Sequence, residues 1–181
     1  MTSPRITPLH PTESDQEQLE VLERVSPRGG TASNLFGTVA KHPQLLKRWA
    51  SFGNSLLRWG ELPPIDREIL VLRTARNCGA DYPWGQHERA AEALGLSEAE
   101  RHELAKDDPQ TDEWTRLLVD VADDLHRDST ISQAHWSALV HRYTESQLIE
   151  LVFVVGQYHL VSLLTNSLGI DPEPGLSTIP R

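Results

Sequence analysis

The sequence predicts an all-α protein built as a single domain. Apolar residues recur at helical spacing along the chain, and no stretch shows the apolar–polar alternation between turn residues that marks a strand. Helix-start signals are also frequent. Ser97 to Glu100 and Thr144 to Gln147 both match the capping box, in which two side chains satisfy free backbone N–H groups. The length of 181 residues fits one domain.

The predicted elements follow from start and stop signals in chain order. Thr31 or Ser33 can cap the second helix, Pro43 suits the first turn of the third, and Gly79 and Gly95 end the fourth and fifth. We expect an extended arm over residues 1–12, a helical domain over 13–170 and an exposed, proline-containing tail over 171–181. The helices are expected at about residues 14–24, 33–39, 43–59, 64–78, 81–94, from 97 onward, 112–126, 132–142 and 145–168.

Composition excludes several classes of function. The net charge of −9, with no basic run to offset it, argues against nucleic-acid binding. The single cysteine, Cys78, cannot form an intramolecular disulfide, and the N-terminal residues have no apolar core of a signal peptide, so we expect a cytoplasmic protein. The most apolar stretch, residues 148–168, is interrupted by Gln157, His159 and Asn166. It therefore predicts a buried helix and no membrane span.

No metal site is expected from the spacing of possible ligands. The eight histidines form no HxxxH or HxH pattern, and no Cys–His cluster stands in the sequence. His135 and His141, six residues apart, would point about 120° apart around a helix. Gly29-Gly30 lacks the context of a phosphate-binding loop. We therefore expect neither a metal nor an organic cofactor.

Two ionisable residues fall on apolar helix faces. Glu68 shares an arc with Ile65, Leu72 and Ala75, and His87 continues an arc with apolar residues of the next helix. Each has a simpler explanation: Glu68 can lie at the edge of its stripe near the helix N-terminus, and a lone core histidine is usually structural. However, burying either group costs least if the two meet, because a carboxylate–imidazole hydrogen bond satisfies both.

The surrounding residues resemble the signature of the carboxymuconolactone decarboxylase and AhpD-like hydroperoxidase group. In the hydroperoxidase branch the pattern is Glu, eleven residues, Cys-x-x-Cys, three residues, His. Glu68 and His87 occupy its ends, whereas Ala80 and Pro83 stand at the cysteine positions. The resemblance covers roughly residues 6–170, with three further similar segments: HPQLLKRW from His42, LPPIDREILVLRTAR from Leu62 and LVFVVGQYHLVSLLTNSLGI from Leu151.

This resemblance implies an AhpD-like helical bundle that forms homotrimers or homohexamers, partly through the long apolar C-terminal helix. It also implies a pocket near Glu68 and His87, walled by Tyr82 and Trp84, because the decarboxylase branch commonly has Tyr-x-Trp in place of the cysteines. The implied activity is cofactor-free decarboxylation or a proton shift on a small carboxylated lactone or cyclic acid. His87 would be the general acid/base and Glu68 its orienting partner.

Two alternatives remain open. One is a hydroperoxidase or thiol-linked activity through Cys78, although a cycle within one chain needs two thiols. The other is a non-catalytic oligomer that binds a small acid. Arg67, Arg73 and Arg76 are candidates to bind a substrate carboxylate by proximity alone, and Tyr158-His159 is a weaker candidate pair.

Overall fold

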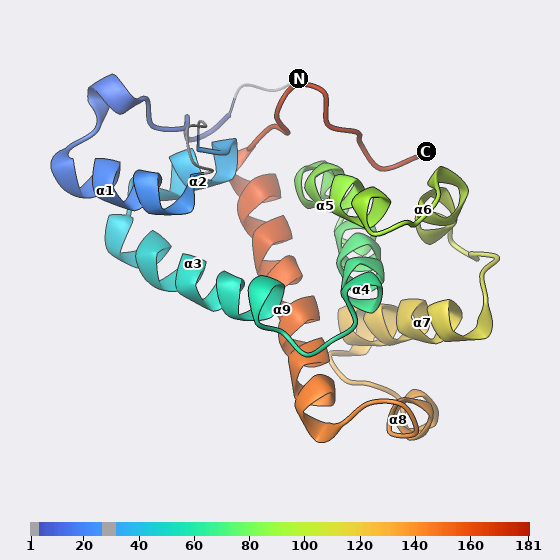
Figure 1. Cartoon of the computed structure of the whole chain (residues 1–181). Coiled ribbons are helices and arrows are strands. Elements are labelled where there is room, and N and C mark those ends of the chain that lie inside the picture. The colour runs from blue at the N-terminus through green and yellow to red at the C-terminus, as the bar shows by residue number, and fades with distance from the viewer. Residues whose placement is uncertain (1–3, 27–31) are drawn as a thin grey trace.

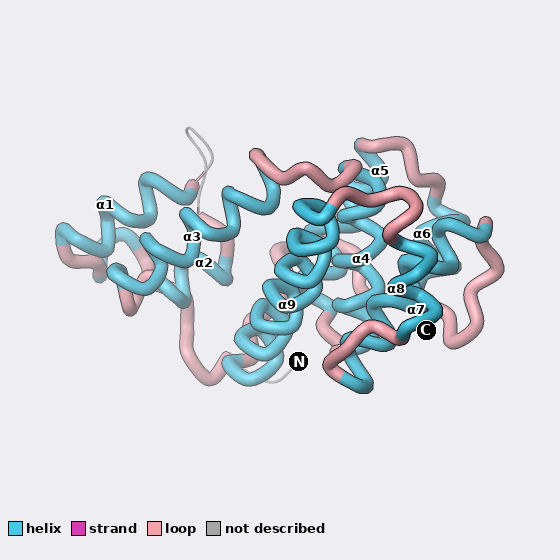
Figure 2. The backbone as a smooth tube through the Cα atoms, turned by 90° about the horizontal axis from the view of Figure 1, so that it is seen from below, coloured by secondary structure: helices cyan, strands magenta, loops and turns pink. Residues whose placement is uncertain are grey.

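The structure is a computed structural model that describes residues 4–26 and 32–181. Within these residues all regular secondary structure is helical, as the sequence predicts (Figures 1 and 2). A 3-10 turn at Pro11–Glu13 precedes the α-helices. Their bounds are α1 Gln16–Val25, α2 Asn34–Val39, α3 Pro43–Arg58, α4 Pro64–Asn77, α5 Asp81–Ala93, α6 Glu98–Leu104, α7 Glu113–Asp128, α8 Gln133–Leu139 and α9 Glu145–Leu168.

Helix α4 lies at the centre of the fold, with α5, α7 and α9 packed around it (Figure 1). Its consecutive residues Leu70, Val71 and Leu72 are all fully buried, which is possible only for a helix covered on every side. Each such side chain contributes about 1.5–3 kcal/mol through removal from water. Glu68 is 1 % exposed, so the prediction that it could lie at the edge of an apolar stripe is wrong. Ile65, expected on the buried arc, is 41 % exposed at the first turn.

The helix caps follow the sequence signals closely. Both predicted capping boxes are present at α6 and α9, with Ser97 and Thr144 as the capping residues. Ser33 caps α2 through its hydroxyl, whereas the other candidate, Thr31, lies outside the described residues. Helix α8 ends at Leu139 rather than Arg142, since the chain must turn there before Thr144 begins the last helix.

Helix α9 is long and apolar enough to cross a membrane by length and composition. However, half of its most apolar 18-residue window is buried inside the fold, which is the arrangement of a core helix. One side of α9 stays uncovered in the single chain. This stripe follows helical spacing around Gly156 and consists of Ile149, Val152, Phe153, Leu160 and Leu163, each between 43 % and 64 % exposed.

The C-terminal tail over residues 171–181 contains no buried residue, yet hydrogen bonds hold it against the fold. Glu173 accepts hydrogen bonds from the backbone N–H of Asn34, the Tyr82 hydroxyl and the Gln86 side chain. The tail crosses α5 at Gly85, where a Cβ atom would lie 2.6 Å from the Ser177 carbonyl oxygen. Glycine is therefore needed at this position for the close approach of the tail.

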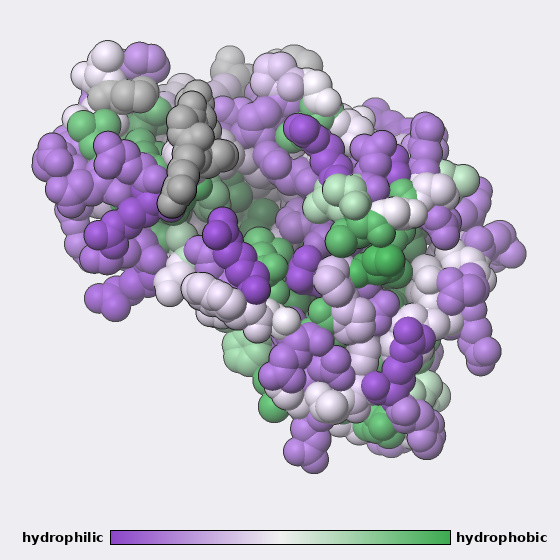
Figure 3. Space-filling model, viewed as in Figure 1, coloured by the Kyte–Doolittle hydropathy of each residue, from purple (hydrophilic) through white to green (hydrophobic). Residues whose placement is uncertain are grey.

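The N-terminal arm is also attached to the helices, although residues 4–10 contain no regular secondary structure. The backbone N–H of Arg5 donates to the Leu168 carbonyl, and that of Leu9 donates to the Gly37 carbonyl. On the face shown in Figure 3, hydrophobic residues gather in patches bordered by hydrophilic ones, one of them in the region of α4 and α5. The N-terminal arm is thus held to the end of α9 and to α2 by backbone hydrogen bonds.

Candidate active site

Glu68 and His87 meet between α4 and α5. Glu68 lies in the second turn of α4 and His87 in the second turn of α5, and their helices are neighbours in space. His87 Nδ1 lies 2.6 Å from Glu68 Oε2, with the Glu68 side chain 2 % exposed and the His87 ring 14 % exposed. The pairing expected from helical spacing is confirmed, while the chemical roles of the two residues stay predictions.

Arg67 holds the second oxygen of the Glu68 carboxylate. Its Nε donates to Oε1 at 3.1 Å, so both carboxylate oxygens have a nitrogen partner. Burial alone would raise the pKa of Glu68, but the hydrogen bond and charge of His87, together with Arg67, outweigh it and hold the pKa below its ordinary value. Glu68 is therefore a carboxylate at neutral pH, able to orient the imidazole and to stabilise its charged form.

The other side of the His87 ring faces α9. The ring of Tyr158 packs against it edge-on, with ring centroids 4.6 Å apart, and burial together with the charge of Glu68 raises the pKa of Tyr158. Among the described residues, His87 Nε2 has no hydrogen-bond partner. Since Nδ1 donates its proton to Glu68, Nε2 of the neutral ring carries the free lone pair. Nε2 is thus the atom available for proton transfer.

Tyr82 and Trp84 both lie in the protein interior. The Tyr82 hydroxyl donates to Glu173 at 3.1 Å and lies 3.4 Å from the backbone N–H of Leu35, so it connects the tail to α2. Burial, with the charge of Glu173, raises its pKa to about 12. Trp84 is fully buried, and its Nε1 has no partner among the described residues. Such an unsatisfied donor is uncommon in a folded protein, and Trp84 lies one helical turn before His87.

Of the three candidate arginines, only Arg67 lies at the pair. Arg73 forms a two-pronged ion pair with Asp123 and donates to the Leu104 and Lys106 carbonyls. Arg76 forms an ion pair with Asp107 and donates a hydrogen bond to the Ala105 carbonyl. These two arginines therefore connect α4 to the segment after α6 and to α7. The sequence could not distinguish them from Arg67, because all three stand on one helix within ten residues.

Three possible metal ligands come together elsewhere, which corrects the expectation that no such cluster exists. The ligand atoms of Cys78, His126 and His159 all lie within 4.8 Å of one another. They stand at the end of α4, in the last turn of α7 and in the middle of α9. Their separations of 48 and 33 residues leave no short spacing pattern, and this is why the sequence search missed them.

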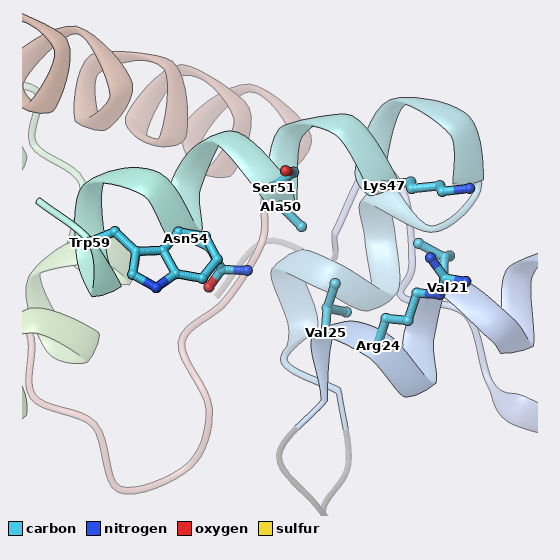
Figure 4. Close-up of a pocket in the computed structure, with 8 residues that line it drawn as sticks. All are labelled: Val21, Arg24, Val25, Lys47, Ala50, Ser51, Asn54 and Trp59. Carbon is cyan, nitrogen blue, oxygen red and sulfur yellow. The ribbon is translucent and has the colours of Figure 1, made fainter.

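A separate shallow groove lies between α1 and α3 (Figure 4). Its lining combines Arg24 of α1 and Lys47 of α3 with Val21, Ala50 and Trp59, and it includes neither Glu68 nor His87. The groove is therefore distinct from the candidate active site.

The fold and the site together define a class: all-helical proteins in which a glutamate and a histidine from adjacent helices form a buried hydrogen-bonded pair. The chain matches the carboxymuconolactone decarboxylase family over residues 43–122, a region that includes both residues. This match relates residues 43–122 to that family, and the solved structures described next show that the chain as a whole has an AhpD-like fold.

Solved structures share this fold over almost the whole chain. An uncharacterized peroxidase-related protein from Silicibacter sp. TM1040 is 20 % identical, with a TM-score of 0.78 and 97 % of both chains covered. A peroxidase-related AhpD-core protein from Ralstonia eutropha JMP134 is 18 % identical, with a TM-score of 0.80, covering 96 % of this chain and 94 % of that one. The debrominase Bmp8 is 14 % identical, with a TM-score of 0.75 and coverage of 93 % and 92 %. A comparison of the sequence with curated proteins finds no match.

The two positions that carry cysteines in the hydroperoxidase pattern lie at the start of α5 and hold residues that are compatible with a helix N-terminus. Ala80 is the buried N-cap residue of α5, and Pro83 stands in the first turn, where its missing N–H is tolerated. Cys78 lies two residues before this motif, with its Sγ 3.9 Å from His126 Nδ1. Burial raises the pKa of the Cys78 thiol, so it is mostly protonated at neutral pH.

Proposed function

We propose that this protein is an acid–base enzyme that decarboxylates, or shifts a proton on, a small carboxylated lactone or cyclic acid. The observation that carries the proposal is the 2.6 Å contact between Glu68 Oε2 and His87 Nδ1. This contact fixes the ring and leaves Nε2 for the substrate. The proposed reaction uses no cofactor, because the substrate's own carbonyl group accepts the electrons.

A single proton-transfer group, the His87 imidazole, is sufficient for both the decarboxylation and the proton shift. Loss of carbon dioxide breaks the carbon–carbon bond to the carboxylate and leaves its electron pair on the substrate as an enolate. A protonated His87 Nε2 then delivers its proton to the enolate carbon. In a proton shift, the neutral Nε2 first removes a proton next to the carbonyl and returns it at another carbon. Glu68 stabilises the imidazolium in both cases, and positioned acid–base catalysis of this kind contributes about 10²–10⁴-fold in rate.

The polar groups around His87 support an acidic substrate. The guanidinium of Arg67 contacts Glu68 through Nε, and its terminal nitrogens have no hydrogen-bond partner among the described residues. They can therefore bind a substrate carboxylate. We assign the unsatisfied Trp84 Nε1, one turn from His87, as a further donor to the substrate. Tyr82 is retained as a proposed wall residue, with its hydroxyl already held by Glu173.

A thiol-based activity through Cys78 is the second candidate, favoured by the peroxidase-related names of two structural neighbours. The raised pKa of the Cys78 thiol speaks against it, since a reactive cysteine needs a stabilised thiolate.

The test follows the ultraviolet absorbance of 4-carboxymuconolactone with purified protein, alongside His87→Ala and Cys78→Ser variants. We expect turnover by the wild type and by Cys78→Ser, and a loss of about 10²-fold or more in His87→Ala with an unchanged circular dichroism spectrum. Equal turnover by His87→Ala would overturn the proposed role of His87, and loss only in Cys78→Ser would favour the thiol reaction. If no variant turns over, the named substrate is wrong. Saturable binding without turnover would then favour the small-acid-binding oligomer.

We also propose that the exposed stripe on α9 binds a second copy of this chain in a homotrimer or homohexamer. The stripe is apolar along its length, and contiguous apolar surface of this kind marks interaction sites. Phe153 of the stripe packs edge-on against Phe52 of α3, with centroids 5.9 Å apart, which extends the apolar surface onto a second helix. An interface here would bury the side of α9 that is exposed in the single chain.

A further inference from the structure

Cys78, His126 and His159 form a compact group of ligand atoms at the junction of α4, α7 and α9. Cys78 Sγ lies 3.9 Å from His126 Nδ1, and His126 Nδ1 lies 2.9 Å from His159 Nε2. The two imidazole rings stack with centroids 5.2 Å apart and an interplanar angle of 21°. The group includes neither Glu68 nor His87, so the proposed proton transfer does not use it.

These distances are close to those of a tetrahedral zinc site. With Zn–N of about 2.05 Å and Zn–S of about 2.3 Å, tetrahedral ligands lie about 3.4 Å apart for two nitrogens and about 3.6 Å apart for sulfur and nitrogen. The observed 2.9 Å and 3.9 Å therefore differ from the ideal edges by about 0.5 Å and 0.3 Å. The third pair, Cys78 Sγ and His159 Nε2, lies within 4.8 Å, so binding an ion requires these two side chains to draw together toward the ideal of about 3.6 Å. Small rotations of partly exposed side chains can provide these adjustments.

Hydrogen bonds from neighbouring groups fix two of the three ligands in orientations suited to metal binding. His159 Nδ1 lies 2.9 Å from the Val155 carbonyl oxygen and donates its proton there, so Nε2 is left with its lone pair pointing at His126. The Asn166 amide donates to the Cys78 carbonyl at 2.9 Å and fixes the backbone of that ligand.

We propose that Cys78 Sγ, His126 Nδ1 and His159 Nε2 bind a zinc ion with one coordination position left for water. One thiolate and two imidazoles suit the borderline-soft Zn²⁺, and three protein ligands with an open fourth position are typical of zinc sites that exchange a ligand. On binding, the Cys78 S–H bond breaks, the Zn–S bond forms and the proton is released to solvent. The His126 ring exchanges its proton through water from Nδ1, where it faces His159 Nε2, to Nε2, which frees the Nδ1 lone pair for the ion. His126 lies at the surface, so the ion has direct access from water.

Isothermal titration of tag-free, metal-stripped protein with zinc chloride tests the proposal. The wild type should bind one ion per chain, and Cys78→Ala, His126→Ala or His159→Ala should each weaken binding at least about 100-fold, because even loss of outer-sphere partners costs 10–100-fold. The matched controls are His102→Ala and His141→Ala, which remove histidines that are also exposed but lie outside the group. The controls should bind as the wild type does.

A cobalt titration supplies an independent readout. Co²⁺ bound at this site should show thiolate-to-metal charge-transfer absorption that is lost in Cys78→Ala and kept in the control variants. Wild-type affinity in all three cluster variants, or equal losses in the controls, would overturn the proposal. Circular dichroism spectra verify that each variant folds. The His87→Ala variant should bind zinc normally, so failure of the proposed enzymatic function would leave this test intact.

Discussion

Replacing Glu68 by glutamine measures how strongly the buried pair is coupled. The carboxylate accepts from His87 at 2.6 Å and from Arg67 at 3.1 Å, whereas the amide can offer an acceptor to only one of these donors. A hydrogen bond to a charged group contributes about 1.5–3 kcal/mol, and disruption of a buried pair costs about 3–5 kcal/mol. We therefore expect Glu68→Gln to lower the free energy of unfolding by about 2–4 kcal/mol.

A double-mutant cycle with His87→Ala isolates the pairwise contribution. Loss of ring packing against Tyr158 occurs on both sides of the cycle and cancels, so the remaining coupling energy between Glu68 and His87 should be about 1.5–3 kcal/mol. Guanidinium unfolding followed by circular dichroism, at one fixed protein concentration, gives the four free energies. A loss of about 3 kcal/mol corresponds to about 6–12 °C in Tm for a chain of this size. A coupling energy below about 0.5 kcal/mol would refute the idea that the two groups stabilise one another.

Two further predictions concern acid stability and assembly. The folded-state pKa of Glu68 lies below its ordinary value of 4.5, so its stabilising effect is complete above that pH and is lost as the pH falls through the lower folded-state value. The Tm of Glu68→Gln should therefore fall less than that of the wild type between pH 7 and pH 3, and parallel Tm curves would contradict this. In size-exclusion chromatography with light scattering, Val152→Asp/Leu163→Asp should convert the proposed oligomer to monomer, while the exposed control Leu94→Asp keeps it assembled. A monomeric wild type, or an assembled double variant, would count against the α9 interface.

The helices could be predicted from the sequence because their limits depend on neighbouring residues. Ser97 and Thr144 satisfy N–H groups three residues away, and Gly169 adopts the positive φ of 65° that ends α9. Helical periodicity placed Glu68 and His87 each on the apolar face of its helix. Because the two helices follow one another in the chain, the sequence predicted that the two side chains meet. Ile65 was misplaced because the packing at the first turn of α4 buries the neighbouring Asp66, which accepts hydrogen bonds from Trp114 and Tyr143, and leaves Ile65 exposed.

Contacts between distant segments could not be predicted in the same way. Glu173 meets Tyr82 across 91 residues, a separation over which helical periodicity and capping signals carry no information. Gly85 was the one local signal, because a glycine in a helix interior costs about 1 kcal/mol and suggests a close approach by other backbone. Cys78 and His126 likewise meet only because α4 and α7 pack together.

The candidate active site and the proposed zinc site share two helices but should act independently. Glu68 and Cys78 are ten residues apart on α4, which places them about 15 Å apart along the helix axis. On α9, Tyr158 packs against His87 while His159, the next residue, points to His126, because consecutive side chains on a helix diverge by about 100°. At such a separation the effects of substitutions normally add. Zinc binding that changed with His87→Ala would therefore indicate that α9 transmits a shift from one site to the other.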